Sequence, residues 1–124
     1  MDKILYLSLG GIVGTLARYG LAGVVYRFFG TSFPFGTFAV NILGCLLVGF
    51  FASLSDKKFL LDPNTRLLLM VGFCGAFTTF STLILETDHL LKDGEMIKAF
   101  LNILLSVVVG FIVFRVGIFL GKII

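Results

Sequence analysis

Charged residues are scarce in this 124-residue sequence, at 14% of the chain, whereas a soluble domain carries roughly 25%. Tryptophan is absent, and histidine occurs once, as His89, with no evident nucleophile partner. The two cysteines, Cys45 and Cys74, lie in apolar stretches without CxxC spacing, as small buried apolar residues do. These absences argue against an enzyme and against a thiolate or zinc site.

Basic clusters and phosphate-binding loops are missing as well. The net charge of +3 comes from residues scattered along the chain, and no glycine-rich nucleotide motif is present. We therefore expect no nucleic-acid partner. Hydrophobic residues instead make up 58% of the chain, which places it in a lipid bilayer.

Four apolar segments are long enough to cross a membrane, because a bilayer core of ~30 Å needs ~20 helical residues. Short polar connections separate them and hold most of the charge. Asp62 and Pro63 fit the N-cap and first residue of the third helix. The sequence thus predicts an all-α integral membrane protein with one domain, residues 1–124. The transmembrane helices are expected at residues 4–28, 35–54, 63–89 and 96–123.

Lysine and arginine divide weakly between the two sides of this bundle, so the positive-inside rule leaves both orientations open. Many small residues on four short helices favour association with a second copy. We expect close helix packing at most of the glycines. The side of the termini carries Lys3, Lys57, Lys58, Arg66 and Lys122, and the other side Arg27, Lys92 and Lys98.

Polar side chains inside the predicted helices form two stripes with i, i+4, i+8 spacing. Polar groups in membrane helices usually face the protein interior or water. Together the stripes predict a thin polar path shared by the helices. The second helix carries Thr37, Asn41 and Cys45, and the fourth carries Asn102, Ser106 and Gly110.

Hydrogen-bond donors line this path, and no carboxylate lies in the middle of a span. A proton-coupled carrier or a cation site would normally use a carboxylate there, so donors alone favour an anion. Phe80 can add the positive edge of its ring, although most of the fifteen phenylalanines are expected to pack or face lipid. The donors are the Asn41 amide and the hydroxyls of Ser81, Thr82 and Ser106.

The stretch GFCGAFTTFST, residues 72–82, places glycines and hydroxyl residues inside an apolar segment. Gly75 and the threonines can break the helix, and carbonyls freed in a membrane need a hydrogen, a water or a cation. Carbonyls converging near a dimer axis could hold a small hard cation such as Na⁺. The residues alone favour a simpler alternative, in which threonine hydroxyls bond the preceding turn and bend the helix.

Three motifs occur in order along the chain: GGIVGTLARY (10–19), PFGTFAVNILG (34–44) and GFCGAFTTFST (72–82). Together they resemble the small fluoride-channel family known as CrcB or Fluc. The resemblance implies an antiparallel, dual-topology homodimer in the cell membrane, with a third helix broken mid-membrane and two narrow pores. It also implies a central Na⁺, structural and not transported, on the carbonyls of Gly75 and Thr78 from both subunits.

The resemblance further implies the residues of the anion path. Asn41 matches the pore asparagine of the family, and Phe80 matches the first of its two pore phenylalanines. Arg18 matches an arginine placed near a pore vestibule. The expected set is Arg18, Thr37, Asn41, Phe80, Ser81, Thr82, Leu83 and Ser106.

Leu83 departs from the usual family pattern TTFSTF, which has a second phenylalanine at this position. Leucine has no ring edge to offer an anion. Either one ring suffices, or this chain is half of a heterodimer with a paralogous partner subunit.

The implied activity is passive export of cytoplasmic fluoride, which enters acid-stressed cells as neutral HF and dissociates inside. The main alternative is a dual-topology four-helix drug exporter, a secondary transporter. That class needs a glutamate in its first helix, where this chain has Arg18, and Glu86 lies too near a helix end to serve. A scaffold subunit without transport has no use for aligned donors inside lipid.

Overall fold

The computed structural model describes residues 2–57 and 61–124, and these residues form helices joined by short connections. Four helical stretches are long and apolar enough to cross a membrane, which confirms an all-helical, multi-pass membrane protein. Their bounds agree with the sequence prediction to within three residues. Lys58, counted above on the side of the termini, lies outside the described residues. The four stretches are α1 (Asp2–Phe29), α2 (Phe35–Asp56), Pro63–Lys92 and α6 (Met96–Ile123).

The third stretch is not one regular helix. It begins at α3 (Pro63–Arg66), where Asp62 is the N-cap and Pro63 the first helical residue, as predicted. It continues as the π-helix η1 (Leu67–Cys74) and the short α4 (Gly75–Phe77), and resumes as α5 (Phe80–Lys92). The π-helix, with its wider i→i+5 turns, has no counterpart in the prediction.

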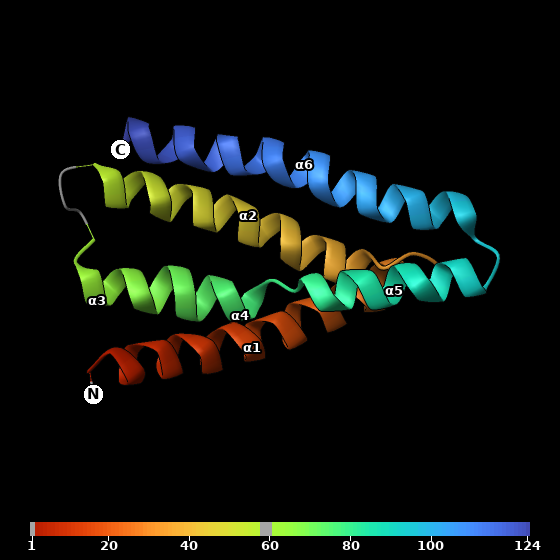
Figure 1. Ribbon diagram of the computed structural model, residues 1–124, viewed down its shortest axis with the longest axis horizontal. Helices are drawn as coiled ribbons and strands as arrows, with labels where there is room; N and C mark the ends of the chain where they lie inside the picture. The colour runs from red at the N-terminus through yellow and green to blue at the C-terminus, as the bar shows by residue number, and fades with distance from the viewer. Residues whose placement is uncertain (1, 58–60) are drawn as a thin grey trace.

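The helices form an elongated bundle with both termini at one end (Figure 1). α2 and α6 run side by side, while α1 packs against η1 and α4. At the end that carries the termini, the Lys57 ammonium donates to the Lys122 carbonyl over 2.6 Å. The connections therefore place Lys57 and Lys122 on one side, as the expected order of the four helices predicts.

Glycines allow the helices to approach at backbone distance. A Cβ on Gly14 of α1 would overlap the Phe73 carbonyl oxygen of η1, and a Cβ on Gly117 of α6 would overlap the Leu46 carbonyl oxygen of α2. Gly11, by contrast, has no such neighbour within 4 Å. Small residues thus mediate helix packing inside the chain, as the sequence suggested for most of them.

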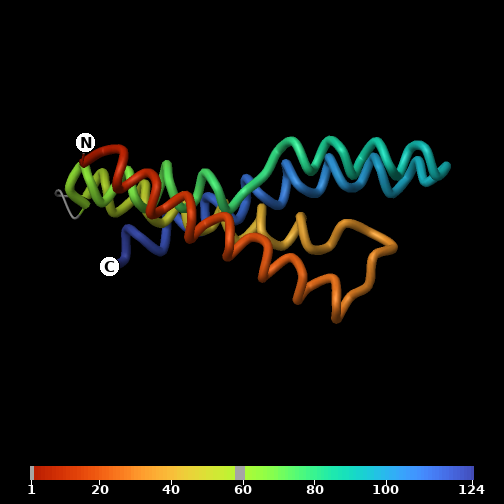
Figure 2. The backbone as a smooth tube through the Cα atoms, turned by 90° about the horizontal axis from the view of Figure 1, so that it is seen from below, coloured from red at the N-terminus to blue at the C-terminus, as the bar shows by residue number. Residues whose placement is uncertain are grey.

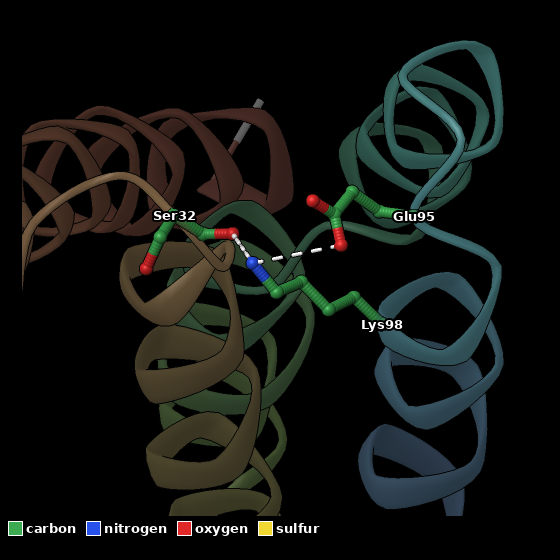
Figure 3. Close-up of polar contacts among 3 residues, drawn as sticks. All are labelled: Ser32, Glu95 and Lys98. Carbon is green, nitrogen blue, oxygen red and sulfur yellow. Dashed lines mark hydrogen bonds and ion pairs between the residues drawn. The ribbon is translucent and has the colours of Figure 1, made fainter.

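The bundle separates into two pairs at the end opposite the termini. Figure 2 shows α5 and α6 continuing together while the ends of α1 and α2 diverge from them. Near the surface, the Lys98 side chain connects the two pairs: Lys98 Nζ donates to the Ser32 carbonyl over 3.3 Å and lies 3.8 Å from Glu95 Oε2 (Figure 3). Because these groups are exposed, the link contributes little to stability.

Candidate functional site

The interruption of the third stretch lies at two threonines. Thr78 (φ −93°, ψ 158°) and Thr79 (φ −150°, ψ 115°) are extended between α4 and α5. Gly75 keeps helical angles (φ −62°, ψ −36°), so the threonines and not the glycine leave the helix. The Thr78 N–H still donates to the Cys74 carbonyl over 3.1 Å, and the helical pattern ends with this bond.

Side chains from two helices and from the interruption itself bond several of the backbone groups at this point. The Asn41 amide of α2 makes two bonds to Thr79: Oδ1 accepts from the Thr79 N–H over 2.7 Å, and Nδ2 donates to the Thr79 carbonyl over 3.1 Å. Arg18 Nε of α1 donates to the Ala76 carbonyl over 3.1 Å. The Thr79 hydroxyl caps α5 by accepting from the Thr82 N–H over 3.3 Å.

Two carbonyls at the interruption lack the backbone bond of a continuous helix: the Thr79 N–H donates to Asn41 and not to Gly75, and the Thr82 N–H donates to the Thr79 hydroxyl and not to Thr78. The Thr78 hydroxyl also donates to the Cys74 carbonyl over 3.0 Å, which is the bonding to the preceding turn that the simpler alternative expected. The freed carbonyls and the bond from Thr78 to the preceding turn therefore occur together. Within residues 2–57 and 61–124, His, Cys, Asp and Glu side chains form no metal-ligating group, so a cation here would depend on carbonyls.

A cavity of about 380 Å³ lies beside the interruption. α2, α4, α5 and α6 all contribute to its wall, and none of its lining residues is a carboxylate. The predicted site residues that line it are Asn41, Gly75, Thr78, Phe80, Leu83 and Ser106.

The polar groups in this wall differ in how they are occupied. The Ser106 hydroxyl is buried and has no hydrogen-bond partner among the described residues. Asn41 uses one amide hydrogen on Thr79 and keeps the other. Phe80 is 74% exposed at the cavity, whereas Leu83 is 5% exposed. The wall can thus offer an anion one hydroxyl, one amide N–H and one aromatic ring.

Four residues of the expected set do not line this cavity. Ser81 is exposed, and the Thr82 hydroxyl accepts from the Thr79 hydroxyl over 3.0 Å. Thr37 is buried near Tyr26, and Arg18 is engaged with the α4 carbonyl described above. In one chain, therefore, only half of the expected anion-path residues line the cavity.

A second polar cluster escaped the sequence analysis. The Tyr26 hydroxyl of α1 donates to Glu86 Oε2 of α5 over 2.8 Å and lies 3.5 Å from Thr37 Oγ1. Glu86 Oε1 is buried without a partner among the described residues. Sequence reasoning set Glu86 aside because it lies near a helix end. The signal was present, since a carboxylate in an apolar segment is costly unless it has a role.

Comparisons with known proteins agree on one family. Residues 5–118 match the family described as "CrcB-like protein, Camphor Resistance (CrcB)". A protein of Maridesulfovibrio salexigens named "Fluoride-specific ion channel FluC" is 45% identical over 124 residues, 100% of this chain and 98% of the relative. A protein of the same name from Chlorobium phaeobacteroides is 47% identical over 119 residues, covering 96% and 92%.

Proposed function

This chain belongs to the CrcB-like family, and on that premise we propose that it is a fluoride-selective passive channel that exports cytoplasmic fluoride across the cell membrane. Relatives named as fluoride-specific channels match it over nearly their whole length. The same kinship confirms the expectation that the chain is not an enzyme.

The observation that carries this proposal is the wall of the 380 Å³ cavity. Fluoride is small and strongly hydrated, so a path for it needs close donors in place of water. The unpartnered Ser106 hydroxyl and the remaining Asn41 amide hydrogen are such donors, and no carboxylate in the wall opposes an anion. A cation carrier would need the opposite arrangement.

A second, antiparallel copy is the partner that we propose for this surface. In a single chain the cavity wall includes Phe80, of which 74% is exposed. An exposed ring beside donors becomes part of a closed path only when another surface covers it. The weak division of Lys and Arg between the two ends is compatible with insertion in both orientations.

A structural Na⁺ at the interruption belongs to the same proposal. The carbonyls of Gly75 and Thr78 do not receive the N–H groups of Thr79 and Thr82, their donors in a continuous helix, and carbonyl groups left unpaired in a bilayer cost several kcal/mol each. Two copies meeting at a two-fold axis in mid-membrane would supply four such oxygens. Na⁺ prefers hard oxygen ligands, and it would hold the subunits together without being transported.

The test is efflux from liposomes that contain only this purified chain. We expect fluoride to leave and chloride to remain, with empty liposomes as the control for leakage. Equal efflux of the two anions would contradict selectivity. Absence of both would contradict a homomeric channel and favour a partner subunit.

Leu83 is the residue that sharpens this test. Its side chain is buried beside the cavity, so a phenylalanine there would extend into existing space. We expect Leu83→Phe to leave fluoride efflux within a few-fold of the parent if one ring per pore suffices. Rescue of a poorly active parent by Leu83→Phe would instead indicate a chain that normally takes its second ring from another subunit.

A further inference from the structure

We propose that Asn41 is a positioning residue, which keeps the Gly75 carbonyl free by holding the N–H group that would otherwise bond to it. The inference deepens the proposed sodium site, because it explains which carbonyls at the interruption become available. It assigns Asn41 a role toward the backbone, in addition to any contact with an anion.

In an uninterrupted helix, each N–H donates to the carbonyl four residues earlier. The Thr79 N–H would then donate to Gly75. In this structure it donates to Asn41 Oδ1 over 2.7 Å instead, and no bond from the Thr79 N–H to Gly75 is formed. Asn41 thus competes directly with Gly75 for one donor.

The Thr78 carbonyl is freed in the same way, because a side-chain oxygen accepts its helical donor. In a continuous helix the Thr82 N–H would donate to Thr78. Here it donates to the Thr79 hydroxyl over 3.3 Å, so the Thr78 oxygen is released. By contrast, the Ala76 carbonyl accepts a hydrogen bond from Arg18 Nε. The two carbonyls assigned to Na⁺ are therefore ones whose donors are held by side-chain oxygens.

Asn41 also prevents the extended link from closing again. Its Nδ2 group donates to the Thr79 carbonyl over 3.1 Å, so both polar groups of the Thr79 backbone are bonded to one side chain of α2. Without that amide, an unpaired N–H and an unpaired carbonyl would face an apolar interior. The least costly response is to restore the helical bond between Thr79 and Gly75.

The experiment observes the Gly75 carbonyl directly. Gly75–Ala76 is the only Gly-Ala pair in the sequence, so protein labelled with carbonyl-¹³C glycine and ¹⁵N alanine gives one correlated NMR signal, that of the Gly75 carbonyl. The full-length protein is measured in detergent micelles, first in N-methylglucamine medium free of Na⁺ and then during a Na⁺ titration.

We expect Asn41→Ala to shift the Gly75 signal in Na⁺-free medium toward that of a hydrogen-bonded carbonyl, and to raise the Na⁺ concentration at half-titration at least tenfold. Ser106→Ala is the matched control, because Ser106 lines the same cavity but touches no backbone group of the interruption. Its signal and titration should superimpose on those of the parent.

Asn41→Asp separates positioning from the anion path. A carboxylate oxygen still accepts from the Thr79 N–H, so the Gly75 signal should stay close to that of the parent while fluoride efflux falls. A Gly75 signal in Asn41→Ala identical to that of the parent in Na⁺-free medium would overturn the inference, whatever the efflux. If Na⁺ fails to move the parent signal, the proposed sodium site is wrong, and the Na⁺-free comparison still decides the role of Asn41.

Discussion

The part of the third stretch before the interruption packs on α1, whereas the part after it packs on α6. η1 and α4 meet α1 at glycines: Gly10 and Gly14 allow backbone contact with the Leu68 and Phe73 carbonyls. α5 meets α6 through larger and partly polar side chains, including a bond of 3.0 Å from Asn102 to the Thr87 hydroxyl. Figure 2 shows the change of partner where the chain crosses the bundle.

This difference explains why the interruption is useful to the fold. A continuous helix would follow one direction and keep one set of neighbours. Two extended residues, Thr78 and Thr79, change the direction and carry the chain from α1 to α6. The carbonyls freed at that point then lie beside the cavity wall, so a packing solution and a ligand site coincide.

The glycine contact of the first part is the most sensitive point of the comparison. We expect Gly14→Val to lower the free energy of unfolding by at least about 3 kcal/mol and so to abolish folded protein. The added side chain would overlap the Phe73 carbonyl, and backbone cannot move aside as a flexible side chain can. Gly11→Val on the same helix is the control, since no heavy atom outside the local helix lies within 4 Å of a Cβ there. Elution of both variants as the same single peak in detergent would contradict the packing argument.

Phenylalanines on either side of the interruption give the next largest contrast. Phe77 is 2% exposed and Phe80 is 74% exposed. Phe77→Ala should lower the stability in detergent by about 3 kcal/mol, the lower end for this truncation in protein cores. Phe80→Ala should reduce fluoride efflux and lower the melting temperature of the protein much less than Phe77→Ala does. Equal melting temperatures for the two variants would mean that burial in one chain does not describe the assembled protein.

The helix boundaries were predictable because each depends on a local run of residues. Apolar length, Pro63 after Asp62, and the turn at Gly94 (φ 77°) locate the helices without knowledge of any distant contact. The cluster of hydroxyl residues likewise located the weak point of the third stretch. Thr78 does bond to the preceding turn, as the simpler alternative expected, but the chain also leaves the helix at Thr78 and Thr79, which that alternative did not expect.

The identity of the freed carbonyls could not be obtained from the residues alone. It depends on Asn41, which is 38 positions away from Thr79 in the sequence. Spacing placed Asn41 on a polar stripe, but it did not indicate a bond to the backbone. The Tyr26–Glu86 pair is separated by 60 positions and was missed for the same reason. Local sequence patterns identify unusual polar residues, but contacts between distant segments determine the hydrogen-bond partners of those residues.

Removing a hydrogen bond between α5 and α6 should lower stability less than adding a side chain at the glycine contact between α1 and η1. Asn102 is 1% exposed, and Thr87→Val would remove the hydroxyl to which it donates. We expect Thr87→Val to lower the free energy of unfolding by about 1 kcal/mol. Interhelical hydrogen bonds in membranes average ~0.6 kcal/mol, and an unsatisfied buried group costs ~1–3 kcal/mol. Adding Asn102→Leu to Thr87→Val should recover most of that loss, and a larger loss in the double variant would contradict this account.

The smallest effect is expected at Asp62, where the stretch begins in water. The Thr65 hydroxyl donates to the Asp62 carboxylate, and this bond lowers the pKa of that carboxyl below its usual range. A carboxyl whose pKa is lowered by folding stabilises the protein above its unfolded pKa, and the stabilisation is lost as the pH falls through the folded pKa. The parent should therefore melt slightly above Thr65→Val at pH 7, and the difference should narrow at pH 3. Because Asp62 is exposed, a shift of many degrees, or a difference that grows in acid, would contradict this reading of the cap.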